Sequence, residues 1–91
     1  MDRDRIQEAL RGIARRKNHV RFRELQSLLD NHIGPLYPNY NHHGSPHHAF
    51  TAGDRTSNIA EPKGKDFVKA PYVKAFLNAM EALGLFAEEE P

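Results

Sequence analysis

The periodicity of the chain changes twice, and this change limits its fold more than any other feature. Helical spacing of apolar residues runs to about residue 34 and returns after residue 70, but no helical period is found between Pro35 and Pro62. Short pieces separated by turn residues fill that interval, which is typical of an antiparallel meander. The sequence therefore predicts an α+β fold of order α-α-β-β-β-α, with helices packed on one face of a small three-stranded antiparallel sheet.

Apolar spacing and end signals define three expected helices. The first covers residues 2–17, starts at Asp2 or Asp4, and ends in basic residues that suit the helix dipole. The second covers about 23–33 and stops at Gly34-Pro35. The third opens at Pro71, runs to about residue 83 and is capped by Gly84.

Three strands are expected between these helices, at residues 36–40, 47–52 and 57–61. Residues 41–46 and 53–55 are the turns that separate them. Pro38 lacks a backbone donor, so the first piece is expected to be an irregular or edge strand.

Length and composition exclude several classes of protein. With 91 residues the chain is expected to be a single domain, 1–91. It has no cysteine, which excludes disulfide scaffolds, zinc ribbons and thiol catalysis. No apolar run approaches the ~18–20 residues of a membrane-spanning helix, and the charged start does not resemble a signal peptide. These features favour a cytoplasmic protein with no membrane partner.

Charge is segregated along the chain although its net value is only +1. Residues 3–23 contain eight basic side chains and two acids, and Lys63, Lys65, Lys69 and Lys74 form a second basic cluster. Acids gather in the expected tail, residues 85–91. This distribution fits either a basic surface that meets phosphate or simply a solvated helix face with a solubilising tail.

Four of the six histidines fall within residues 42–48, and three interpretations compete for them. A metal site is disfavoured because successive strand residues point to opposite faces and no cysteine or nearby acid completes a ligand set; we expect no metal and no cofactor. One histidine can instead act as a general acid or base. The remaining interpretation is that the histidines are exposed, inert turn residues.

Strand alternation distinguishes His47 from His48. Phe50 is the large apolar residue of its strand and should face the helices, together with His48. His47 then lies on the open face, just after a Gly-Ser turn, where a ligand can reach it. His48 is expected at the rim of the core, in a structural role.

The stretch Gly44-Ser45-Pro46-His47, with Phe50 three residues further on, resembles the marker of the HicA toxins. Further similarity lies in the order of four other segments: Val20-Arg-Phe-Arg-Glu-Leu25, Asp54-Arg55 with Asn58-Ile59, Gly64-Lys65, and Lys69-Ala-Pro-Tyr-Val73. The matches span residues 18–84 as a HicA-like core, and residues 1–17 form an additional N-terminal helix. The family has a double-stranded-RNA-binding-domain-like (dsRBD-like) fold.

The resemblance implies a toxin of a toxin–antitoxin pair, a metal-independent endonuclease that cleaves messenger RNA with a single histidine, here His47. One imidazole can take the proton of a ribose 2′-OH, which DNA lacks, so DNA is not an expected substrate. Supporting roles fall to Ser45, His43 or His48, with water as an alternative proton donor. Lys63, Lys65 and Lys69 would bind RNA, and a HicB-type antitoxin would cover His47.

Two alternatives from other classes remain open. A non-catalytic RNA-binding module, or an inactive HicA relative, would use the same basic face and bind RNA without His47. A protein-interaction domain would not bind RNA even at low salt.

Overall fold

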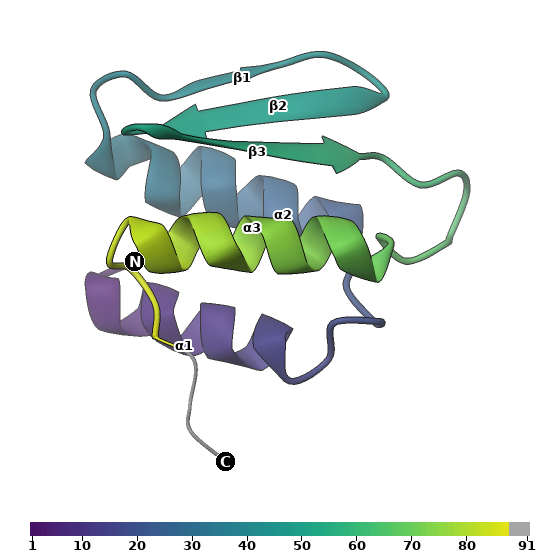
Figure 1. Ribbon diagram of the computed structural model, residues 1–91, viewed down its shortest axis with the longest axis horizontal. Helices are drawn as coiled ribbons and strands as arrows, with labels where there is room; N and C mark the ends of the chain where they lie inside the picture. The colour runs from purple at the N-terminus through teal and green to yellow at the C-terminus, as the bar shows by residue number, and fades with distance from the viewer. Residues whose placement is uncertain (88–91) are drawn as a thin grey trace.

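The computed structural model describes residues 1–87 and has the element order that the sequence predicts (Figure 1). The helices are α1 (Arg3–Ala14), α2 (Phe22–Leu28) and α3 (Ala70–Ala82); α2 continues as one π-helical turn, η1 (Leu29–Ile33), and a 3₁₀ turn, η2 (Gly34–Leu36). The strands are β1 (Asn41–His43), β2 (His47–Ala52) and β3 (Arg55–Ala60). The predicted α+β class is confirmed.

The elements form three layers in Figure 1. The antiparallel sheet has the order β1-β2-β3, α2 and α3 lie against one of its faces, and α1 lies beyond them, away from the sheet. Ile6, Leu10 and Ile13 of α1 have no exposed surface, so this helix is built into the hydrophobic core. Because α1 packs on the helical side, it leaves the opposite face of the sheet uncovered.

Two antiparallel pairings set which side chains face the helices. His48 pairs with Ile59, and Phe50 pairs with both His42 and Ser57. Phe50 and Ile59 are almost fully buried against the helices. The alternate positions of the three strands consequently point to the uncovered face, and His47, paired with Ala60, is among them.

The predicted first strand at 36–40 is wrong. That stretch holds only the last residue of η2 and a turn, and the strand lies a few residues later, in the segment expected to be a turn. The Tyr40 ring packs over Gly34, so closely that an added β-carbon would meet its Cδ2 at 2.6 Å. This packing and the missing donor of Pro38 hold the segment out of the sheet.

The other predicted boundaries differ by a few residues. The first helix ends at Ala14, because the chain turns at residues 15–18, and β3 starts two residues before the predicted 57. A two-residue turn at Gly53-Asp54 joins Ala52 to Arg55, and the Asn39 side chain bonds both the N–H and the carbonyl oxygen of Gly53, at 3.0 and 2.7 Å.

The C-terminal end contributes to the core before the acidic segment starts. Leu85 and Phe86, within the expected tail of residues 85–91, are each 4% exposed and belong to the hydrophobic core. The glutamates at 88–90 lie outside the described residues. Over residues 1–87, none of the helices combines the length and the apolar character needed to cross a bilayer.

Candidate functional site

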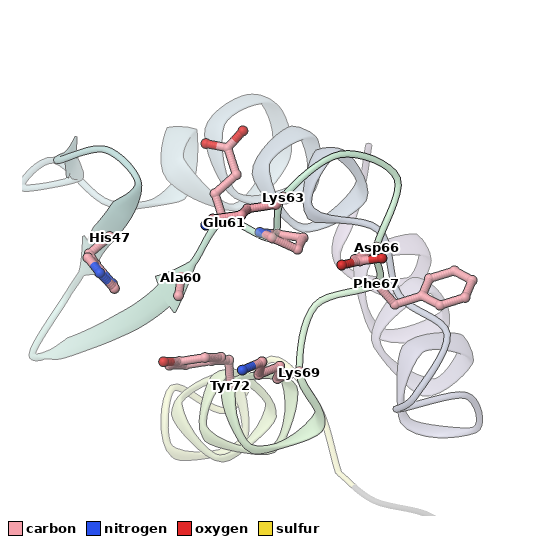
Figure 2. A pocket seen from close by; sticks show the side chains of 9 residues that line it. His47, Ala60, Glu61, Lys63, Asp66, Phe67, Lys69 and Tyr72 are labelled. Atoms are coloured by element: carbon pink, nitrogen blue, oxygen red, sulfur yellow. The ribbon is translucent and has the colours of Figure 1, made fainter.

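A cleft of about 370 Å³ opens beside His47, where β2 begins and β3 ends, near the start of α3 (Figure 2). His47 is the first residue of β2 and is exposed, whereas its neighbour His48 is 7% exposed and faces the helices. Both orientations agree with the predicted strand alternation. Ala60, directly opposite His47 on β3, is small and leaves room between the strands and α3.

Two of the three lysines expected to bind RNA share this cleft with His47. Lys63, in the loop after β3, and Lys69, immediately before α3, both line it. Lys65 does not line it, because the loop carries this residue toward α2. The three lysines are therefore divided between this cleft and a neighbouring groove.

Tyr72 belongs to the same cleft, and the sequence reasoning did not assign it a role. Its ring is half-buried against the core, and Figure 2 shows the hydroxyl directed toward the side of the cleft where Ala60 and His47 lie. Tyr72 sits in the first turn of α3, which starts at Ala70, one residue before the predicted Pro71. A phenol, an imidazole and two ammonium groups therefore surround one opening.

Acidic side chains also border the cleft. Glu61 and Asp66 are among its lining residues, and Figure 2 shows the Glu61 carboxylate turned away from His47. The Phe67 ring likewise points out of the cleft. The imidazole of His47, the ammonium groups of Lys63 and Lys69 and the hydroxyl of Tyr72 are the remaining polar groups that line the cleft.

A second groove, of about 750 Å³, runs on the other side of the loop that follows β3. Its basic residues are Arg21, Arg23 and Lys65. Arg21 donates a hydrogen bond to the carbonyl oxygen of Lys65, and its guanidinium lies 4.0 Å from the centre of the Phe67 ring. Arg21 thereby fixes the loop that separates the groove from the His47 cleft.

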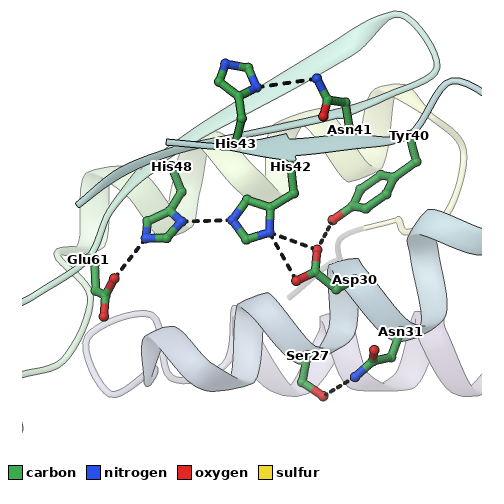
Figure 3. A network of polar contacts seen from close by, with 9 residues as sticks. All are labelled: Ser27, Asp30, Asn31, Tyr40, Asn41, His42, His43, His48 and Glu61. Carbon is green, nitrogen blue, oxygen red and sulfur yellow. Dashed lines mark hydrogen bonds and ion pairs between the residues drawn. The ribbon is translucent and has the colours of Figure 1, made fainter. Parts of the chain in front are cut away.

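His48 belongs to a chain of polar contacts beneath the sheet, shown in Figure 3. Its Nε2 lies 2.8 Å from Oε1 of Glu61, and its Nδ1 lies 2.8 Å from Nε2 of His42. The other nitrogen of His42 lies 3.1 Å from both carboxylate oxygens of Asp30. Tyr40 donates to Asp30 at 2.5 Å. These contacts join η1 to all three strands or their ends.

The structure shows no direct link between the other candidate residues and the cleft. His43 is exposed on β1, on the uncovered face of the sheet, where its Nδ1 lies 3.4 Å from Nδ2 of Asn41. Ser45 is exposed in the turn before β2 and precedes the cis peptide bond to Pro46. His48, with both ring nitrogens engaged, lies below the sheet.

Asp30 and Glu61 are the residues of this chain of contacts that sequence reasoning missed. A signal existed for Glu61, because strand alternation places it on the same face as Ile59 and thus near His48. Asp30 is a polar residue beside the buried Leu28 and Leu29, and nothing local identifies its partner. Within residues 1–87, no group of three or more potential ligands is arranged to hold a metal ion.

Comparison with known proteins gives no relative. The chain matches no protein-family model, and neither a curated protein nor a solved structure is significantly similar to it.

Proposed function

We propose that this protein is a HicA-like toxin, a metal-independent endonuclease that cleaves messenger RNA at the His47 cleft. The observation that supports this function best is the composition of that cleft, which combines one solvent-accessible imidazole with the cationic side chains of Lys63 and Lys69. An imidazole beside cations is suited to a reaction that removes a proton and develops negative charge on a phosphate.

The arrangement of the core supports the same assignment. From α2 to α3 the element order is α-β-β-β-α, the order that the resemblance implies. The additional helix α1 packs on the side away from the sheet, so it does not cover His47.

In the proposed reaction, His47 takes the proton of a ribose 2′-OH, and the 2′-oxygen attacks the adjacent phosphorus. The bond from phosphorus to the 5′-oxygen breaks, leaving a 2′,3′-cyclic phosphate and a 5′-hydroxyl. Lys63 and Lys69 stabilise the charge on the non-bridging oxygens. We assign the proton received by the leaving oxygen to Tyr72, since its hydroxyl shares the cleft and His48 is engaged with other partners.

An antitoxin of the HicB type would act by covering the cleft. Lys63 and Lys69 favour a partner that presents carboxylates or another mimic of phosphate to this opening. The proposed toxin works in the cytoplasm, where its messenger RNA substrate is found.

The test is cleavage of an end-labelled RNA by wild type and His47→Ala, both in EDTA, with RNA binding measured alongside. We expect His47→Ala to bind RNA like wild type but to cleave about 10²–10⁴-fold more slowly. His43→Ala is the matched control, because it removes an exposed imidazole from the same hairpin outside the cleft.

Three outcomes contradict the proposal in different ways. Equal cleavage by wild type and His47→Ala would remove His47 from the mechanism. RNA binding by both without cleavage would favour a non-catalytic RNA-binding module. Absence of binding even at low salt would favour a protein-interaction domain.

A further inference from the structure

The chain Asp30–His42–His48–Glu61 contains three close contacts between polar groups, and each needs one hydrogen. The contacts are Asp30 to His42 at 3.1 Å, His42 to His48 at 2.8 Å, and His48 to Glu61 at 2.8 Å (Figure 3). Both ends of the chain are carboxylates, which accept hydrogen bonds when ionised. The hydrogens must therefore come from the two imidazoles.

Two neutral imidazoles provide one hydrogen too few. His42 must donate from Nδ1 to Asp30, and His48 must donate from Nε2 to Glu61. A neutral imidazole has a single N–H, so Nε2 of His42 and Nδ1 of His48 would then face each other with lone pairs at 2.8 Å. One additional proton converts this repulsive contact into a hydrogen bond.

The surroundings favour that proton. The pair lies between the carboxylates of Asp30 and Glu61, whose side chains are 30% and 45% exposed. Aromatic rings enclose the imidazoles. The Phe50 ring stacks on the His42 ring with 4.0 Å between their centroids, and the centroid of the Phe22 ring lies 4.5 Å from that of His48. Solvent reaches Glu61, the more exposed of the two carboxylates.

Other polar and charged groups approach the chain from each neighbouring element. Tyr40, from the segment before β1, donates to Asp30. Arg21 and Arg23, at the start of α2, border the groove that Glu61 also lines, as do Lys65 and Asp66 from the loop after β3. His43 and His47 lie on the opposite face of the sheet.

We propose that His42 and His48 share one proton, as an imidazolium and an imidazole between two carboxylates, and that this proton locks the β1–β2 hairpin in the position that presents His47. His42 and His48 are thus positioning residues, not catalytic ones. The shared proton is independent of the proposed nuclease function, whereas its consequence for His47 rests on that function.

The shared proton predicts how the free energy of unfolding depends on pH. In an unfolded chain histidine is largely neutral above about pH 7.5, so the unfolded state binds one proton fewer than the folded state. Stability then falls as pH rises through the alkaline range. For one proton, the unfolding equilibrium constant increases by at most about tenfold per pH unit.

Glu61→Gln removes the need for the extra proton but keeps all three contacts. The introduced amide would donate to Nε2 of His48, whose Nδ1–H would donate to His42, whose Nδ1–H would donate to Asp30. Glu81→Gln is the matched control, since it removes the same charge from an exposed position on α3.

The experiment is chemical denaturation of wild type, Glu61→Gln and Glu81→Gln at intervals from pH 6.5 to 9.5. We expect wild type and Glu81→Gln to lose stability above pH 7.5, and Glu61→Gln to lose less. The unfolding equilibrium constant of wild type should rise faster with pH than that of Glu61→Gln, by up to about tenfold per pH unit. Equal pH dependence of all three would overturn the proposal. So would a Glu61→Gln protein that does not fold, because the variant retains every contact.

Nitrogen NMR of wild type at pH 8 is a second, independent measurement. Three of the four ring nitrogens of His42 and His48 should carry hydrogen, and a count of two would contradict the shared proton. RNA cleavage separates the two proposals: wild type should lose activity above pH 7.5 sooner than Glu61→Gln. If neither protein cleaves RNA while the stability difference is present, the proposed nuclease function is contradicted and the shared proton is supported.

Discussion

The Tyr40 hydroxyl donates a 2.5 Å hydrogen bond to Asp30, and this contact connects the segment before β1 to η1. Burial of the Tyr40 ring raises the pKa of its hydroxyl, and the hydrogen bond to the Asp30 carboxylate raises this pKa further. The same carboxylate accepts from His42. Asp30 is therefore the point at which the segment before β1 and strand β1 itself are both tied to the helical layer.

The raised pKa gives a pH-dependent prediction for Tyr40→Phe. Because folding raises the pKa of the Tyr40 hydroxyl, its contribution to stability is fully present at pH values below the pKa of tyrosine in the unfolded chain, which is about 10. This contribution is lost as the pH rises above that value. Below pH 9, we expect Tyr40→Phe to be less stable than wild type by about 1–3 kcal/mol. Above pH 10 the difference should shrink. Chemical denaturation measures it, and a difference that is constant to pH 11 would contradict the assignment.

Substitutions in α1 should show that this helix is part of the core. Leu10 is fully buried, and Leu10→Ala is expected to cost about 2–5 kcal/mol in the free energy of unfolding. On the same helix, an added β-carbon at Gly12 has nothing within 4 Å, so Gly12→Ala should stabilise the protein by about 0.5–1 kcal/mol. Thermal denaturation tests both; a small effect of Leu10→Ala would mean that α1 is dispensable.

Tyr72→Phe tests the assignment of the leaving-group proton. The substitution keeps the half-buried ring and removes only the hydroxyl, so folding and RNA binding should not change. Cleavage should slow by about 10²-fold or more. Tyr37→Phe, which alters another half-buried tyrosine outside the cleft, should cleave like wild type. Full activity of Tyr72→Phe would leave the proton to Lys69 or water.

The positions of the lysines predict unequal effects on RNA cleavage. Lys69→Gln should reduce both binding and cleavage, because Lys69 lines the His47 cleft. Lys65→Gln removes the same charge from the second groove and should change the cleavage rate at saturating RNA much less. For single-stranded RNA, removing one lysine–phosphate interaction should reduce the slope of log affinity against log salt by about 0.7. Cleavage that falls equally in both variants would show that the two openings act as one site.

The sequence by itself determined the α+β order, the position of β2 and the opposite orientations of His47 and His48. These features follow from local rules: apolar spacing sets the helices, and alternation in a strand sets which side chain is buried. The wrongly predicted strand at residues 36–40 is also explained in part by a local feature, because Pro38 lacks a backbone donor.

Only the tertiary structure decided which side chains meet. Tyr72 and Lys69 share a cleft with His47, and Lys65 does not, because the path of the loop after β3 is set by contacts such as that of Arg21 with the Lys65 carbonyl oxygen. Asp30 and Glu61 are far apart in the sequence and flank one histidine pair through the packing of η1 under the sheet. Local periodicity assigns a residue to a face, but contacts between distant segments depend on how the faces pack together.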